Sequence, residues 1–363
     1  MKTLAISRTA LDVPILLFLG WILLTVPFAT DWSYSLEEWQ KSIPRFLIFW
    51  FVVNVVKTEK DIRSILHSFS IGLVLLAILE SVHFIVEGGN AFSMKMRAGG
   101  LSGSSQWLSC FLVIGIPVLW LGFFCDTRLW VRRLYLLALV MSGVALFLVH
   151  TRAAWLAVMT QGFFYMVLRM TRSWIISGLI VFFSVGLLIV FLAIPGQHRE
   201  LISSSKFTSP RSMLLRFNTW DLATQDIREH PLTGIGYGKH SFYLRHPNLE
   251  KSYHNHIHNS FLSSMVQVGI PGFLVLASIF WVVLRKSSEW SQRFSEQYLG
   301  NLAFAVFFIT VGLIVRLIFD DMLIGNVVYL FMFLLGVCFS LGGQLEAKAK
   351  TKPLAEGARV SFP

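Results

Sequence analysis

The chain has 363 residues, of which 55% are hydrophobic and 14% are charged, with a mean hydropathy of +0.65 and a formal net charge of +11. A soluble domain of this length does not need so much apolar surface, so the composition excludes a water-soluble globular protein. It predicts an all-α integral membrane protein, because backbone exposed to lipid must satisfy its own hydrogen bonds and a helix bundle does so.

Ten apolar runs are long enough to cross a bilayer as helices, so we predict a polytopic bundle of about 10 transmembrane helices with one large, partly helical outer loop. In chain order the predicted spans are 13–30, 40–56, 64–86, 105–124, 134–150, 153–168, 173–194, 259–284, 300–319 and 322–342. The predicted organisation is seven N-terminal helices in 1–194, the loop in 195–258, three helices in 259–342 and a cytoplasmic tail in 343–363.

Clusters of Lys and Arg stand before the first predicted span and after every second one. Because such residues are retained on the cytoplasmic side, that side is predicted to hold all the clusters and both termini. The positive net charge is therefore explained mainly by the orientation of the chain in the membrane, and we predict no nucleic-acid partner. The clusters are Lys2 and Arg8; Lys57, Lys60 and Arg63; Arg128, Arg132 and Arg133; Arg169 and Arg172; Arg285, Lys286 and Arg293; and Lys348, Lys350 and Lys352.

The segment 195–258 falls on the opposite, outer face, yet it carries eight Lys or Arg against five acidic residues. Long loops escape the positive-inside rule in part, so a tolerated basic loop is one interpretation. A site for an anion is the other. The segment also holds seven of the ten histidines: His198, His230, His240, His246, His254, His256 and His258.

One part of this loop, 210–229, is predicted to be helical. Ser209 can cap it, Pro210 suits its first turn, and His230 with Pro231 ends it. Apolar residues recur at helical spacing, which predicts a helix that lies along the membrane surface or covers a cavity. The apolar stripe consists of Met213, Phe217, Trp220, Ala223 and Ile227.

Two arginines of this helix are candidate ligands for an anion. Arg216 and Trp220 are four residues apart and share a face, and Arg211 lies in the first turn, where backbone donors also favour anions. A single arginine is more often solvated or bound to a lipid headgroup, but two of them beside a histidine cluster favour a site. The next stretch, HPLTGIGYGKHSF, lacks the context of a dinucleotide fingerprint and predicts a tight turn that brings backbone near a ligand.

Three alternating histidines close the loop. In an extended chain His254, His256 and His258 face one way, a spacing compatible with zinc, whereas in a helix only the first and last share a face. No carboxylate or cysteine stands nearby, so we predict no metal. His258 directly precedes an apolar span, at the depth where a lipid-borne substrate presents its head group, and an imidazole accepts a proton at neutral pH. The histidines predicted to be exposed loop residues are His198, His230 and His246.

Several other ionisable residues are not explained by the orientation rule. Arg152 lies between two apolar runs on the outer side, so we expect a buried guanidinium with a partner or a water-filled cavity. Arg316 has a partner in Asp320, four residues later. Glu80, His83 and Glu87 recur at roughly helical spacing near the outer end of the third predicted span, which indicates a polar cavity wall, although internal pairing is favoured over catalysis for Glu80 and His83. Arg97, on a Gly/Ser-rich outer loop, is placed to reach that cavity.

Together these residues predict an outward-opening cavity lined by Arg152 and covered by a loop that contributes Arg216, Arg211 and His258. The planar fork of arginine suits phosphate, and a diphosphate attached to a lipid is the anion that a membrane site meets. If that diphosphate is a leaving group, arginines stabilise the charge that grows on it, and a histidine removes the proton of an incoming hydroxyl.

Three motifs, in order, resemble those of the O-antigen ligase and polymerase superfamily. The first is TRAA at 151–154, similar to the family's short Ser/Thr-Arg-small element. The second is RFNTW at 216–220, followed by HPLTGIGYGKHSF at 230–242, and the third is HNSFLSSMVQVGIPGFL at 258–274.

The resemblance implies an inverting, metal-independent glycosyltransferase without a cofactor. It implies a multi-pass protein of the bacterial inner membrane, with its active site facing the periplasm and a donor glycan carried by undecaprenyl diphosphate. By motif position, Arg152 and Arg216 contact the diphosphate and His258 is the base, with Arg211 and His256 as alternatives. The further residues assigned to substrate binding are Arg97, Asn259 and Trp220.

Ligases of this family join the glycan to a lipid A-core acceptor, in lipopolysaccharide biosynthesis, whereas polymerases join it to another lipid-linked repeat. The short chain and the single large outer loop favour the ligase, which is our prediction, with the polymerase as the alternative. An anion or metal transporter is a further alternative. It predicts inverted repeats or helices interrupted at the bilayer midplane, which we do not find in the sequence.

Overall fold

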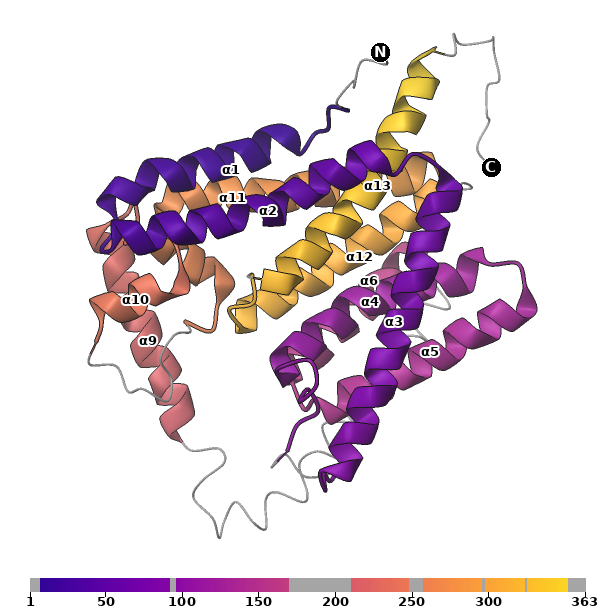
Figure 1. Ribbon diagram of the computed structural model, residues 1–363, viewed down its shortest axis with the longest axis horizontal. Helices are drawn as coiled ribbons and strands as arrows, with labels where there is room; N and C mark the ends of the chain where they lie inside the picture. Colours follow the sequence, from indigo (N-terminus) through magenta and orange to yellow (C-terminus); the bar gives the residue numbers. More distant parts are fainter. Residues whose placement is uncertain are drawn as a thin grey trace.

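A computed structural model (Figure 1) describes residues 7–91, 96–169, 210–247, 257–295, 298–323 and 325–351, and every regular element within these ranges is helical. The prediction of an all-α protein is confirmed. The elements are α1 (Asp12–Thr25), η1 (Val26–Phe28), α2 (Trp32–Val55), α3 (Glu59–Val86), α4 (Ser105–Cys125), α5 (Leu129–Leu148), α6 (Arg152–Arg169), α9 (Pro210–Glu229), α10 (Lys239–Arg245), α11 (Ser260–Arg293), α12 (Tyr298–Phe319) and α13 (Gly325–Thr351).

Six of these helices are long and apolar enough to cross a membrane: α3, α4, α5, α11, α12 and α13. The stretch Asp12–Phe28 is apolar but shorter. Helix α2 carries four charged residues between Glu37 and Arg45, and α6 begins and ends on an arginine. The seventh predicted span, 173–194, lies outside the described residues. The chain is therefore a multi-pass membrane protein, and the number of ten spans stays a prediction.

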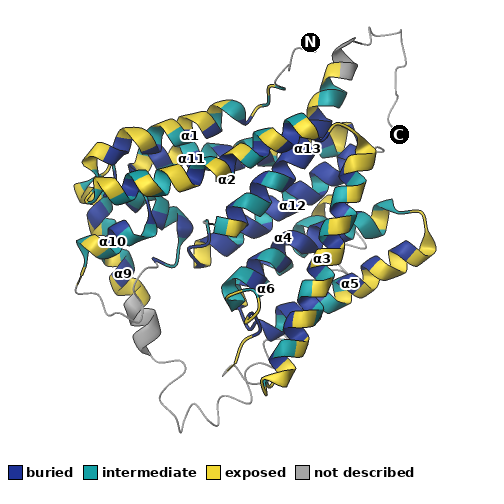
Figure 2. Ribbon diagram, viewed as in Figure 1, coloured by how far each residue is buried: buried dark blue, intermediate teal, exposed yellow. Residues whose placement is uncertain are grey.

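The outward faces of the bundle are apolar, as a lipid environment requires. In α1, for example, Ile15 and Ile22 are buried, whereas Leu16, Leu17 and Leu24 are exposed. Figure 2 shows the same division along α2, α3 and α5, while α4 and α12 are buried over most of their length. Apolar residues on both faces of a helix indicate burial in protein on one side and in lipid on the other.

Three of the basic clusters, those after the second, fourth and eighth predicted spans, lie at one end of the bundle. Lys57, after α2, donates to the Ser7 hydroxyl at 3.2 Å, and the Arg63 guanidinium at the start of α3 lies 3.9 Å from the ring centre of Tyr298 at the start of α12. Helices α1 and α13 respectively begin and end on this side (Figure 1). We call it the basic end, defined by residues 56–63, 125–133 and 285–293.

The opposite end carries α9 and α10 (Figure 1). There the Ala98 N–H donates to the Leu148 carbonyl at 3.0 Å, and the Thr30 N–H donates to the Ile235 carbonyl at 2.8 Å. Each of these hydrogen bonds joins two segments that are far apart in the sequence. We call this the loop end, defined by residues 96–104, 148–152, 210–247, 257–260 and 320–323.

Helix α9 begins at Pro210 and ends just before His230, as its end signals predict. Trp220 and Ala223 pack against a small core that includes Ile235, Ile257 and Val266. Phe217, by contrast, is 54% exposed, so among the described side chains of the stripe the contact with protein begins at Trp220.

Helix α9 is also joined to α10 by charge. The buried carboxylate of Asp226 accepts from Arg245 at 2.7 Å and contacts His246 at 2.8 Å. The prediction that His246 is an exposed loop residue is therefore wrong, because its ring is paired and largely covered. An isolated pattern of histidines cannot show which of them meets a carboxylate twenty residues away.

Helix α11 is broken at Gly269, next to Pro271. Gly269 has φ +71°, and the break frees carbonyls of the preceding turn for other donors. The Val266 and Gln267 carbonyls accept from the N–H groups of Ile235 and Gly236, at 2.8 and 3.2 Å. The glycine-rich stretch that follows α9 thus delivers backbone donors to a kinked membrane helix, whereas the predicted approach to a ligand stays a prediction.

The substitution Gly269→Ala is expected to destabilise the protein. A non-glycine residue at this φ is strained by about 1–3 kcal/mol, and its Cβ would lie 2.3 Å from the Leu232 carbonyl oxygen. Gly20→Ala is the matched control, because a Cβ there meets nothing within 4 Å. Thermal unfolding of the detergent-solubilised variants measures the difference, and equal melting temperatures for the two would show that the kink is not required.

Helix α13 continues beyond 342, where we expected the last span to end. Its Glu346 carboxylate accepts from the Trp290 indole at 2.8 Å and from Lys286 at 3.2 Å. The first part of the predicted tail is therefore helical and attached to α11. Residues 352–363 lie outside the described residues.

Candidate functional site

His258 immediately precedes Asn259, the N-cap residue of α11. Asn259 caps the helix, and its side-chain oxygen accepts from the N–H groups of Phe261 and Leu262, both at 3.0 Å. His258 itself has φ +53°, an uncommon backbone conformation for a residue other than glycine. Such a residue is held in place by its surroundings, and its side chain remains 26% exposed.

A carboxylate orients the His258 ring. Nδ1 of His258 lies 3.3 Å from Oδ1 of Asp320, and Arg316 holds the other oxygen of Asp320 at 3.1 Å. Arg316 is fully buried and also donates to Gln106 and to Ser109 on α4. The predicted pair of Arg316 and Asp320 is confirmed. Its further contact with His258 was not predicted.

Asp320 stays ionised. Burial alone would raise the pKa of its carboxyl group, but the hydrogen bond from His258 and the charge of Arg316 hold that pKa well below its ordinary value. A permanent carboxylate at Nδ1 favours the tautomer that carries its proton there, which makes Nε2 the acceptor nitrogen of the ring. This arrangement of carboxylate and imidazole is suited to a general base.

The next residue, Asp321, belongs to a second network. Its carboxylate accepts from Ser263 at 2.9 Å and lies 3.8 Å from the Lys239 ammonium, which also donates to the Asp321 carbonyl at 2.5 Å. Burial raises the pKa of Asp321, against the opposing charge of Lys239, and burial likewise lowers the pKa of Lys239. Two adjacent carboxyl groups are thus placed in different electrostatic environments.

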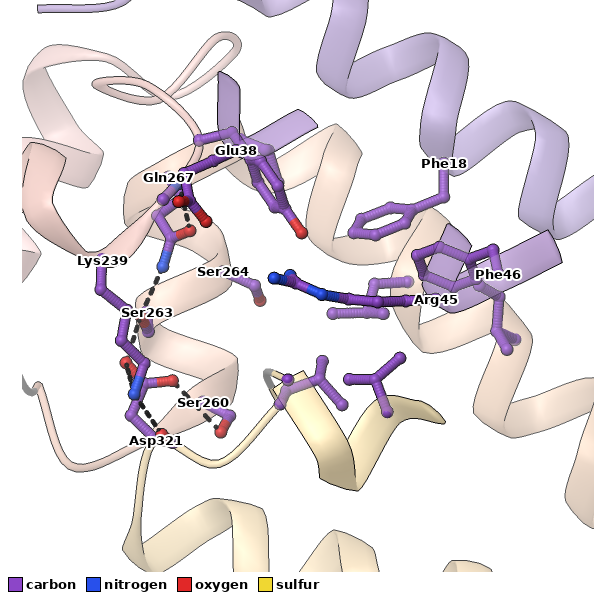
Figure 3. A pocket seen from close by; sticks show the side chains of 18 of the residues that line it. Phe18, Glu38, Arg45, Phe46, Lys239, Ser260, Ser263, Ser264, Gln267 and Asp321 are labelled. Atoms are coloured by element: carbon purple, nitrogen blue, oxygen red, sulfur yellow. Dashed lines mark hydrogen bonds and ion pairs between the residues drawn. The ribbon is translucent and has the colours of Figure 1, made fainter. Parts of the chain in front are cut away.

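A cavity of about 310 Å³ begins beside this second network and continues between α1, α2, α11 and α13. Figure 3 shows Lys239 and Asp321 at one side of it and the apolar rings of Phe18 and Phe46 at another. Arg45 of α2 extends into the space between them. No hydrogen bond or ion pair joins Arg45 to another described residue, and the carboxylates of Glu38 and Asp321 line the same cavity.

Arg45 is a candidate ligand that our sequence reasoning missed. The signal was available, because Arg45 lies inside the second predicted span, 40–56, and a charged residue within a span marks a site by default. Lys239 was missed for another reason. Nothing in the sequence around it shows that α10 meets Asp321, which lies 82 residues later.

Trp220 connects α9 to the residue that precedes His258. Its indole N–H donates to the Ile257 carbonyl, immediately before His258, at 2.7 Å. Arg216 lies one turn earlier on the same helix and is exposed, without a hydrogen bond or ion pair to any described residue. The side chain of Arg211 and the whole of His256 lie outside the described residues.

Arg152 and Arg97 occupy neighbouring segments of the loop end. Arg152 is the first residue of α6 and is exposed, so the expectation of a buried guanidinium is wrong. Arg97 is also exposed, next to Ala98, whose N–H is bonded to the end of α5. The predicted internal pairing of Glu80 is confirmed: its buried carboxylate accepts from the backbone of this loop.

The structure thus brings some predicted site residues together and keeps others apart. Trp220, His258 and Asn259 meet at the start of α11. No hydrogen bond or ion pair between described residues joins Arg152 or Arg216 to His258, although all three belong to the loop end. No cluster of three His, Cys, Asp or Glu suited to a metal ion occurs in the described ranges, and His254 lies outside them.

Comparison with known proteins adds one finding to this geometry. Residues 134–277 match the family model described as O-Antigen ligase. The matched region contains Arg152, Arg216 and His258, as well as the glycine-rich stretch and the kink of α11. No curated protein matches the chain. The match covers residues 134–277 of the 363, and it supports an assignment of this region to the O-antigen ligase/polymerase superfamily.

Proposed function

We propose that this protein is an O-antigen ligase, which transfers a glycan from undecaprenyl diphosphate to a lipid A-core acceptor. The proposal includes a ten-span topology in the bacterial inner membrane, with the loop end facing the periplasm. The observation that carries it is the His258–Asp320 pair at the loop end. His258 lies within the region that matches the family, and Asp320 lies outside it. The gathering of basic residues at the other end supports the orientation.

In the proposed reaction Nε2 of His258 removes the proton from an acceptor hydroxyl. The acceptor oxygen forms a bond to the anomeric carbon of the glycan while the bond from that carbon to the diphosphate oxygen breaks, so the configuration is inverted. The proton ends on His258 and the electron pair on the diphosphate. Asp320 stabilises the resulting imidazolium, because its carboxylate lies beside Nδ1.

The leaving diphosphate gains negative charge, which arginine stabilises through paired, charge-assisted hydrogen bonds. Arg152 and Arg216 are proposed for this role, since they are exposed at the loop end and without partners among the described residues. The cavity is proposed to receive the first part of the lipid carrier. Its apolar walls suit an isoprenoid chain, and Arg45 and Lys239 provide positive charge beside them.

The ligase and the polymerase differ in the acceptor, so the decisive assay varies the acceptor alone. Purified protein in liposomes is supplied with lipid-linked glycan, with or without lipid A-core. We expect glycan-bearing core only when core is present, and no product from the variant His258→Ala. Lengthening of the lipid-linked glycan without core would instead establish a polymerase. Flux of a labelled anion or metal ion in the absence of glycan would contradict both enzymes.

A further inference from the structure

A second and larger cavity lies at the basic end, far along the bundle from His258. It has a volume of about 830 Å³ and is formed between α3 and α5. Ile71 and Leu75 of α3 and Leu134 and Leu137 of α5 contribute apolar, exposed side chains to it. Because these residues belong to two helices that can cross a membrane, the walls of the groove face the hydrocarbon of a bilayer.

The mouth of this groove is positively charged. Lys60, Arg63 and Arg128 line it, together with a single carboxylate, Asp126. Arg63 is engaged by Glu59 at 2.7 Å. Lys60 and Arg128 are exposed, and neither side chain forms an ion pair with another described residue. One oxygen of Asp126 accepts the backbone N–H of Arg128, so it belongs to the turn.

A polar pair lies between the charged mouth and the apolar part of the groove. The hydroxyl of Tyr135 contacts Nδ1 of His67, and both residues line the cavity. Ser64 lies one turn nearer the mouth. The groove therefore changes along its length from cationic, through hydrogen-bonding, to apolar. A glycerophospholipid has the same order of phosphate, glycerol ester and acyl chain.

We propose that the groove between α3 and α5 binds an anionic glycerophospholipid of the cytoplasmic leaflet, with its phosphate at Lys60 and Arg128. Basic pockets between membrane helices on the cytoplasmic side suit anionic headgroups, each nearby basic residue adding to the attraction. The acyl chain lies along Leu75 and Leu134. The groove is at the opposite end of the bundle from His258, so this lipid is not the glycan donor.

The positive-inside rule explains basic residues at this end without any ligand, so the test must separate a bound lipid from topology. The variant Lys60→Gln/Arg128→Gln removes two charges from the mouth of the groove. Arg132→Gln/Arg133→Gln is the matched control, because it removes two charges from exposed residues of α5 that do not line the groove. A third variant, Leu134→Trp, fills the groove and leaves its charge unchanged.

Native mass spectrometry of the full-length protein in detergent measures binding during titration with phosphatidylglycerol, phosphatidylethanolamine or inorganic phosphate. We expect phosphatidylglycerol to bind at least about tenfold more tightly than phosphatidylethanolamine. The Lys60→Gln/Arg128→Gln variant should lose this preference, Leu134→Trp should lose binding of both lipids, and the control should retain the wild-type values.

Three outcomes would overturn the proposal. They are equal binding of the two phospholipids by the wild type, an equal loss of preference in the control variant, and binding of inorganic phosphate as tightly as phosphatidylglycerol. The last would identify a site for small anions. No glycan is present in the measurement, so its result is independent of the proposed transferase activity.

Discussion

Replacement of His258 by alanine is expected to lower the rate of glycan transfer by about a hundredfold or more, the usual effect of losing a general base. The start of α11 should survive, because Asn259 provides the cap. Turnover is measured with lipid-linked glycan and lipid A-core at saturating concentrations, where loss of a base lowers kcat and leaves substrate binding largely unchanged.

A second variant separates loss of the imidazole from strain in the backbone. His258 has φ +53°, a conformation that asparagine adopts more readily than alanine, so His258→Asn preserves the local geometry while removing the base. Both variants should be equally inactive. If both retained near-normal turnover and His256→Ala lost it, the base would be His256.

Replacement of Arg152 or of Arg216 by alanine is expected to reduce transfer to background, because each substitution removes one of the two guanidinium groups proposed to stabilise the departing diphosphate. Membrane insertion and thermal stability should be unchanged, since both side chains are exposed. Transfer is measured as glycan-bearing core, and stability by thermal unfolding of the same preparations.

Arg228→Ala is the matched control, because Arg228 is an exposed arginine on the same helix as Arg216. It should retain full activity. The conservative variant Arg216→Lys keeps the charge but not the planar fork, and it should recover only part of the rate. Near-normal turnover of both alanine variants would rule out the proposed diphosphate contacts.

Features encoded locally in the sequence were predictable. The ends of α9 follow from Pro210 and from His230–Pro231, and the pair of Arg316 and Asp320 follows from helical spacing. The gathering of basic residues at one end also follows from hydropathy and charge. Each of these features depends on residues that are close in the sequence, or on a property summed over a span.

Features that depend on packing between distant helices were not predictable. His258 and Asp320 are 62 residues apart, and the position of Arg45 in the cavity requires α2 to lie against α11 and α13. Asn259 shows a further limit. It was assigned to substrate binding, but its side-chain oxygen caps α11, which leaves only its amide nitrogen to meet a substrate.

The break at Gly269 divides α11 into a short segment that carries His258 and a long segment that crosses the membrane. The thickness of the bilayer constrains the tilt of the long segment, but it does not constrain the short one. The position of His258 therefore depends on the bend and on the backbone docked against it, while Asp320 orients the imidazole ring. In the proposed ligase, a change in the angle of this bend would fit His258 to a differently shaped acceptor without rearranging the helices that cross the membrane.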